Sequence, residues 1–166
     1  MQTIMFRAAQ PVNCLASSDG RVYLGAMVAK IVDYVLDDQI GYVLRRATQR
    51  HLALFSEAIP DVTTTQFAVL ARLAETGPQS QNHLGRATAM DAATIKGVVD
   101  RLVRQGLVET AADLADRRRL TVKLTEAGAA LFRQSVATAL KVSRKTLEPL
   151  SPAEARQVLQ LLARLT

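Results

Sequence analysis

The chain has 166 residues and carries 21 Lys and Arg against 15 Asp and Glu, a net charge of +6. This length suits one domain, or one domain with an arm, and the basic balance fits a polyanionic partner such as nucleic acid. The single cysteine, Cys14, excludes an intrachain disulfide and a cysteine-based metal site, and favours a reducing, cytoplasmic location. No apolar run reaches the roughly 18 to 20 residues that span a bilayer, so we expect no membrane partner.

Residues 1–33 are predicted to form an N-terminal arm or extension. The first 20 residues have little periodicity and contain Pro11 and a Ser-Ser-Asp-Gly turn. A disordered arm, a short extra helix, and an upstream extension with Met27 as an alternative start all fit this stretch. Cys14 has no basic residue closer than Arg7, so an ordinary thiol fits it better than a reactive one.

A long helix is predicted to begin at the Asp37-Asp38 pair and to end before Pro60. Its apolar residues recur at helical spacing: Ile40, Val43, Leu44, Ala47, Leu54, Phe55 and Ala58. His51 continues this stripe, and Arg46 and Arg50 flank it. The usual reading is a core histidine beside two solvated arginines. If the stripe lines a cavity, however, the three side chains would suit a carboxylate.

Two shorter helices are predicted next. The segment Thr63 to Gln66 has the pattern of a capping box, and the helix 64–75 that follows should bury Phe67 and end at Gly77. Ser80 then caps a short helix. Ser80 and Gln81 either cap that helix only or also bind a phosphate through backbone amides.

The next helix begins at Asp91, which can act as its N-cap, and ends at Gly106. Its apolar face comprises Ile95, Val98, Val99, Leu102 and Val103. Its other face is polar and partly basic, and it carries small side chains near the start of the helix. The residues of this face are Thr94, Lys96, Gly97, Asp100, Arg101 and Arg104. Two short helices joined by a few residues form a helix-turn-helix, in which the second helix can enter the major groove of DNA.

Two short strands, residues 107–110 and 121–124, are predicted after this helix. Asp116, Arg117, Arg118 and Arg119 lie near the tip of the turn between them. Adjacent arginines repel one another unless a negative charge lies between them. The phosphates that line the minor groove of DNA would supply that charge. The alternative is a solvated basic loop, but the helix immediately before the strands favours DNA.

A long helix, about Glu126 to Leu147, and a last helix that begins at Ser151 complete the chain. The apolar stripe of the last helix is wide: Val158, Leu159, Leu161, Leu162 and Leu165. We expect it to pack on another subunit.

These residues resemble the MarR family of bacterial winged-helix regulators from about Val35 to the C-terminus. The motif Asp116-Arg117-Arg118 with Val122-x-Leu124-Thr125-x-x-Gly128 is similar to that family's wing, and Asp100-Arg101-Leu102 to its recognition helix. The resemblance implies a mostly α fold with a winged helix-turn-helix, long N- and C-terminal dimerisation helices and a two-stranded β-wing. The regions implied are a dimerisation helix (34–60), a DNA-binding region (61–125) and C-terminal dimerisation helices (126–166). It also implies a homodimer that binds double-stranded DNA at a pseudo-palindromic operator, usually to repress transcription.

The resemblance also implies roles for single residues. Thr94 and Lys96 match base-contacting positions, whereas Arg101 and Arg104 would be structural or near phosphate. Arg118 matches the arginine that enters the minor groove, Asp116 the residue that orients it, and Arg117 and Arg119 phosphate contacts. Gly97 departs from the family, in which a larger and often basic residue is common.

The segment Tyr34 to Gly41, together with Leu44-Arg45-Arg46, is similar to the start of the first long helix in those members of the family that regulate aromatic-acid catabolism. This predicts an effector that is an aromatic carboxylate or its coenzyme A thioester, with Arg46, Arg50 and His51 as anion contacts and Phe67 as a wall. Two alternatives stay open: a regulator that responds to oxidation of Cys14, and a winged helix used only for protein contacts. An enzyme is disfavoured, because the sequence has two histidines, no metal-ligand spacing and no nucleophile motif.

Overall fold

The computed structural model describes residues 34–112 and 120–165. Cys14, Met27 and the whole of the predicted arm, together with Asp116, Arg117, Arg118 and Arg119, lie outside the described residues. The chain divides into two units, Met1–Gln39 and Ile40–Thr166. Within the first unit, the described part contains one 3₁₀ turn, η1 (Leu36–Asp38).

The predicted start of the first long helix was wrong. The Asp37-Asp38 pair belongs to η1, and the long helix α2 begins at Ile40 and runs to Ala58. Gln39 separates the two elements because its backbone is extended, with φ −86° and ψ 124°. Its side-chain amide donates to the carbonyl of Val35 at 3.0 Å, which holds this break in place.

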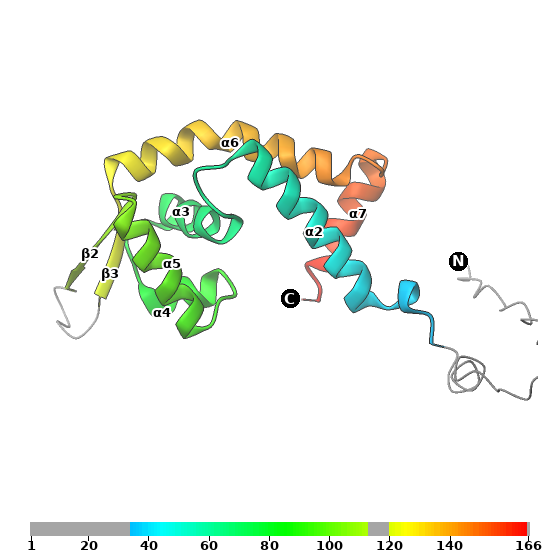
Figure 1. The fold of residues 1–166 in the computed structure, drawn as a ribbon, viewed down its shortest axis with the longest axis horizontal. Helices are drawn as coiled ribbons and strands as arrows, with labels where there is room; N and C mark the ends of the chain where they lie inside the picture. The colour runs from blue at the N-terminus through cyan, green and yellow to red at the C-terminus, as the bar shows by residue number, and fades with distance from the viewer. Residues whose placement is uncertain (1–33, 113–119, 166) are drawn as a thin grey trace, which may run out of the picture. The chain divides into compact units, whose positions relative to one another are not determined.

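The second unit has a small winged domain at one end, from which the longest helix runs to the other end, where two further helices lie (Figure 1). α2 packs along α6 (Glu126–Leu147), and α7 (Pro152–Leu162) follows α6. None of the helices in the described part of the chain is long and apolar enough to cross a membrane. The boundaries of α6 agree with those predicted, because Thr125 accepts a hydrogen bond from the Gly128 amide and caps the helix.

The winged domain contains α3 (Thr64–Thr76), β1 (Gln79–Ser80), α4 (Gln81–Ala87), α5 (Ala92–Arg104), β2 (Val108–Ala112) and β3 (Leu120–Leu124). The strands form one antiparallel sheet in the order β1-β3-β2. The mostly α, winged-helix fold class is therefore confirmed. The sheet has one more strand than the two-stranded wing that was predicted, because Gln79 and Ser80 pair with Val122 and Thr121.

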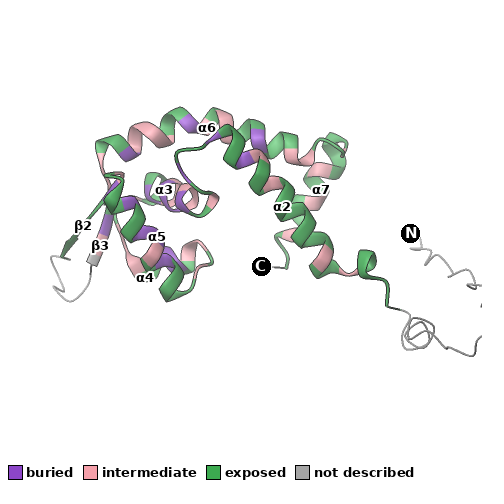
Figure 2. Ribbon diagram, in the orientation of Figure 1, coloured by how far each residue is buried: buried purple, intermediate pink, exposed green. Residues whose placement is uncertain are grey.

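One hydrophobic core lies beneath α3, α4 and α5 and extends to α2 and α6 (Figure 2). Leu70, Leu84 and Leu102 are fully buried in it. The apolar stripe predicted for α5 is buried except for Val103, which is 41% exposed. In α2 only Phe55 is buried, whereas Ile40, Val43 and Leu44 are exposed in the single chain.

Candidate DNA-reading surface and ligand pocket

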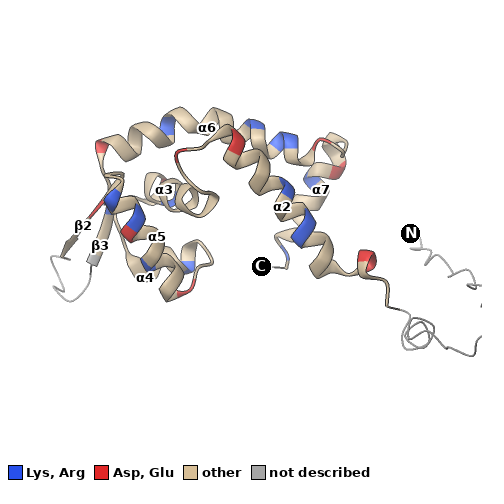
Figure 3. Ribbon diagram, viewed as in Figure 1, with Lys and Arg blue, Asp and Glu red and all other residues tan. Residues whose placement is uncertain are grey.

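The face of α5 that was predicted to read DNA is exposed. Thr94, Lys96, Arg101 and Arg104 all lie on the surface, while the opposite face packs into the core. Lys96 pairs with Asp100 at 2.7 Å, with both side chains half-exposed or more. An exposed pair of this kind contributes only about 0.3–0.5 kcal/mol, so Lys96 can exchange its partner for a phosphate or a base edge. The charged residues of α5 are coloured in Figure 3.

Caps at both ends fix the length of α5. Asp91 accepts a hydrogen bond from the amide of Thr94 at 2.7 Å. The backbone amide of Thr94, and then its side chain, lower the pKa of Asp91 below the ordinary 3.8. At the other end Gly106 has φ +70°, the left-handed conformation that ends helices, and the Leu107 amide donates to Leu102 at 2.9 Å.

Gly85 lets α4 and α5 approach closely, a contact that the sequence analysis missed. The amide of Met90 donates to the carbonyl of Gly85 at 2.8 Å. A Cβ at Gly85 would lie 3.1 Å from the Met90 carbonyl and 3.2 Å from Cγ2 of Ile95. The helix-turn-helix therefore depends on the missing side chain at this position. Ser80 caps α4 by accepting a hydrogen bond from the His83 amide at 3.3 Å, and Gln81 is the first residue of that helix.

The base of the wing is tied to the end of α5 by Thr125. Its hydroxyl donates to the carbonyl of Gly106 at 2.7 Å while it accepts from the amide of Gly128 at 3.0 Å. On the wing itself Lys123 pairs with Glu109 at 2.9 Å across β2 and β3. The strands thus leave the core at a fixed point.

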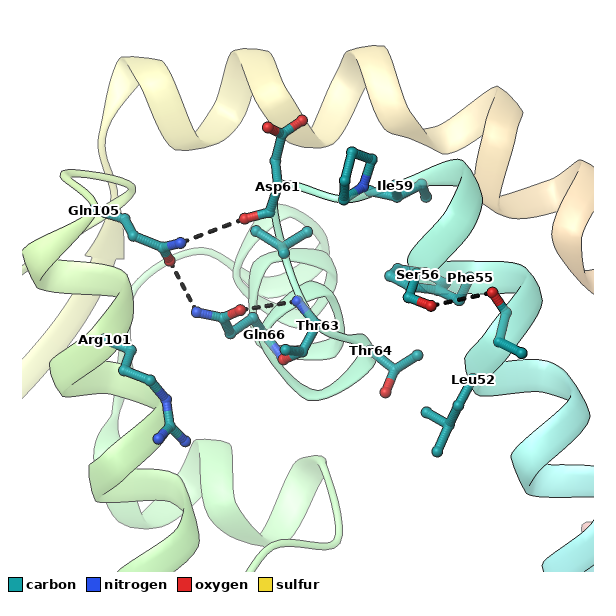
Figure 4. Close-up of a pocket in the computed structure, with 13 residues that line it drawn as sticks. Leu52, Phe55, Ser56, Ile59, Asp61, Thr63, Thr64, Gln66, Arg101 and Gln105 are labelled. Carbon is teal, nitrogen blue, oxygen red and sulfur yellow. Dashed lines mark hydrogen bonds between the residues drawn. The ribbon is translucent and has the colours of Figure 1, made fainter.

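A pocket of about 600 Å³ lies between the C-terminal half of α2, the linker to α3, and α5 (Figure 4). This volume falls in the range of small-molecule sites, about 300–1,000 Å³. The apolar residues that line it are Leu52, Ala53, Phe55, Ile59, Pro60 and Val62. The polar residues are Ser56, Asp61, Thr63, Thr64, Gln66, Arg101 and Gln105. The pocket therefore offers one apolar wall, from α2, and one polar wall, from α3 and α5.

Three hydrogen bonds, which we call the glutamine bridge, cross the polar wall (Figure 4). The amide of Thr63 donates to Oε1 of Gln66 at 2.8 Å, and Nε2 of Gln66 donates to Oε1 of Gln105 at 2.8 Å. Nε2 of Gln105 then donates to the backbone carbonyl of Asp61 at 3.3 Å. A backbone N–H can only donate and a carbonyl can only accept, so both ends of the bridge fix the orientation of the two side-chain amides.

The ligand contacts predicted from sequence do not line this pocket. Arg50 donates to the carbonyl of Lys145 at 3.1 Å, and Nδ1 of His51 lies 3.0 Å from the hydroxyl of Thr146. Both residues therefore join α2 to α6. The Arg46 guanidinium lies 5.7 Å from the centre of the Tyr42 ring.

Phe67 is half-buried behind the pocket. It packs edge-on to Phe55, with ring centres 5.5 Å apart, and against Phe132 at 5.4 Å. From the sequence, Gln66 is predicted only as a capping residue, and Arg101 only as structural or near phosphate. Gln105 was not predicted, because no local motif marks it.

Comparison with known proteins places this fold in a family. The sequence profile of the MarR family matches residues 61–119. The HTH-type transcriptional repressor NicR of Pseudomonas putida is 40% identical over 134 residues, which cover 80% of this chain and 85% of NicR.

Two solved structures are also similar. A probable transcriptional regulator from Pseudomonas aeruginosa has 53% identity and a TM-score of 0.77, over 80% of this chain and 100% of that one. BpsR of Bordetella bronchiseptica, whose DNA binding is regulated by 6-hydroxynicotinic acid, has 39% identity and a TM-score of 0.77, over 81% of this chain and 97% of BpsR. The family predicted from the wing and recognition-helix motifs is thereby confirmed: the chain belongs to the MarR family of winged-helix transcriptional regulators.

Proposed function

We propose that the protein is a dimeric repressor that leaves its operator when a small aromatic acid, or its coenzyme A thioester, binds. The observation that carries this proposal is the pocket against α5, the helix that would read DNA: Arg101 of that helix and its C-cap residue Gln105 both line the pocket. A ligand there lies against the DNA-reading element itself. Similarity to the repressor NicR and to BpsR, which responds to an aromatic acid, supports the same function.

The dimer is supported by apolar side chains that the single chain leaves exposed. Leu159, Leu161 and Leu165 on and after α7 are 57%, 48% and 71% exposed, and Ile40 at the start of α2 is 62% exposed. Ile40, Leu161 and Leu165 share one apolar groove of about 440 Å³. A second copy would cover this surface, and its two-fold axis would set two α5 helices roughly 34 Å apart, one turn of DNA.

The aromatic-acid part of the proposal is supported by the chemistry of the pocket walls. Phe55 and Ile59 offer an apolar face for a ring. Arg101 is the only cation among the residues that line the pocket, so it would pair with the acid group. Arg46, Arg50 and His51 form a second candidate position for that group, earlier on α2.

The test is fluorescence anisotropy of the protein on DNA from the region upstream of its own gene, at several salt concentrations. We expect tight, salt-sensitive binding that 6-hydroxynicotinic acid or a related aromatic acid relieves. The corresponding amide, which lacks the charge, should not relieve it, and the coenzyme A thioester of each active acid is tested in parallel. Binding no tighter than to random DNA, or a complex that no compound relieves, would contradict the proposal.

Three variants separate the candidate positions for the acid group. If the acid pairs with Arg101, Arg101→Met should weaken the response to the compound, whereas His51→Ala and Arg46→Ala should leave it unchanged. The opposite pattern would place the acid on the earlier part of α2.

A further inference from the structure

The glutamine bridge is where the pocket meets the DNA-reading helix. Gln105 follows the last residue of α5, and its amide reaches the linker between α2 and α3 at Asp61. Asp61, Gln66 and Gln105 are also lining residues of the pocket. Anything that fills the polar side of the pocket therefore lies against the bonds that fix the end of α5.

We propose that the glutamine bridge transmits ligand binding to α5. An anionic ligand opens the bridge by accepting the hydrogen bond that Nε2 of Gln105 otherwise donates to the backbone carbonyl of Asp61. This inference rests on the ligand-controlled repression proposed above, and it assigns a positioning role to Gln105 and Gln66 within that function.

The bond lengths indicate where the bridge opens. The bond from Gln105 to Asp61 is 3.3 Å long and exposed, whereas the two bonds of Gln66 are both 2.8 Å. Gln66 is 5% exposed, and loss of its partners would leave a buried amide unsatisfied. The Gln105–Asp61 bond is thus the weakest of the three. Breaking it leaves no buried polar group without a hydrogen-bond partner, because this bond is exposed to solvent.

An acid group is well suited to break that bond. Arg101 and Gln105 are four residues apart, on one face of α5 and its C-cap, and both line the pocket. The Arg101 guanidinium runs back along the helix, where a Cβ on Gly97 would lie 3.7 Å from its Nη2. Arg101 forms no ion pair with another residue in the described part of the chain. A carboxylate between Arg101 and Gln105 would gain charge-assisted hydrogen bonds, which are roughly twice as strong as the neutral bond to Asp61.

Opening the bridge would change how α5 is held. With the bridge closed, α5 is fixed at its end to both α3 and the linker. With the Asp61 bond broken, the end of α5 keeps its packing on α3 but loses its tie to the linker that continues into α2. A ligand that prefers this open arrangement lowers operator affinity to the extent of that preference.

The experiment compares wild type with Gln105→Met, which keeps the length of the side chain and the net charge but removes both hydrogen bonds. The same anisotropy assay measures operator Kd without ligand and with 6-hydroxynicotinic acid. Without ligand, we expect the operator Kd of Gln105→Met to rise about threefold to tenfold, the net effect of losing the bond to Asp61, which ties the end of α5 to the linker. Affinity for random DNA should not change, and the Kd ratio with and without the compound should fall toward one.

Two further variants make the result specific. Gln134→Met is the matched control, because Gln134 is exposed on α6 and does not line the pocket, and it should behave like wild type. Gln105→Glu still accepts from Gln66 but places a carboxylate oxygen opposite the Asp61 carbonyl, so it should lose operator affinity and also bind the acid more weakly. Thermal unfolding checks that each variant folds.

The outcomes distinguish this inference from the proposed function. If the acid releases wild type and Gln105→Met alike and their operator Kd values agree, the bridge is not the coupling element and ligand control stands. If no compound releases wild type, the proposed function and the ligand step both fail. In that case, weaker operator binding by Gln105→Met would still assign the bridge a role in positioning α5.

Discussion

Gly128, in the first turn of α6, lies directly against the backbone of Leu107, just beyond α5. A Cβ on Gly128 would overlap the carbonyl oxygen of Leu107. That overlap involves backbone, which cannot rotate away as a side chain can. The contact therefore fixes where the long helix α6 leaves the winged domain.

Gly128→Ala is expected to destabilise the fold by about 3 kcal/mol, the upper part of the usual range for overpacking. Gly41→Ala is the matched control, because Gly41 also lies in a helix but has nothing within 4 Å of its Cβ position. That change should be neutral or stabilising by up to about 1 kcal/mol. Urea unfolding measures the stability of both variants. If Gly128→Ala is as stable as Gly41→Ala, Gly128 does not lie as close to the Leu107 backbone as described.

Thr125→Val should destabilise the protein by about 1–2 kcal/mol, because it removes the cap of α6 and the bond to Gly106 together. Thr125→Ser keeps the hydroxyl and should recover most of that loss. Urea unfolding of the two variants checks this. A serine variant as unstable as the valine variant would show that the two hydroxyl bonds alone do not account for the stabilisation, because valine keeps a methyl group and serine keeps the hydroxyl.

Asp91→Asn keeps an oxygen that can accept from Thr94 but removes the charge. The folded protein lowers the pKa of Asp91 below its ordinary value of 3.8, so the charged form is favoured by folding. Its contribution is fully present above the unfolded-state pKa and is lost as pH falls through the lowered pKa. Wild type should exceed the variant in stability at neutral pH, and the difference should shrink on acidification. A difference that is constant with pH would contradict this role.

Arg118→Ala is expected to weaken operator binding and to reduce the slope of log K against log salt by about one, the loss of one DNA contact. Arg144→Ala removes the same charge from the exposed end of α6 and serves as the control. Anisotropy titrations over a salt series measure both slopes. If the two variants lower the slope equally, the effect is one of net charge and not of the wing.

Leu161→Glu is expected to convert the proposed dimer to a monomer, because it places a charge in the apolar groove shared with Ile40 and Leu165. Operator affinity should fall with it, since a monomer cannot bind two half-sites at once. Gln157→Glu adds a similar charge on α7 outside that groove and should stay dimeric. Sedimentation equilibrium measures both masses, and a dimeric Leu161→Glu would exclude this surface as the interface.

The sequence by itself determined most helix starts and the family. Thr63, Ser80, Asp91 and Ser151 all cap the helices that follow them as their motifs predicted. These caps are readable because each hydrogen bond spans only three residues, so its energy depends little on the rest of the fold. The same locality explains Gly106, which ends α5 by its own conformation.

The tertiary structure alone decided the pairings between distant residues. β1 has two residues and no periodicity, and it exists because Gln79 and Ser80 lie beside β3. Gln66 and Gln105 are 39 residues apart, and no motif links them. A partner that far along the chain is selected by how the whole core packs. The position of the pocket, the bridge across it and the close contact of Gly128 therefore appear only when the helices are assembled.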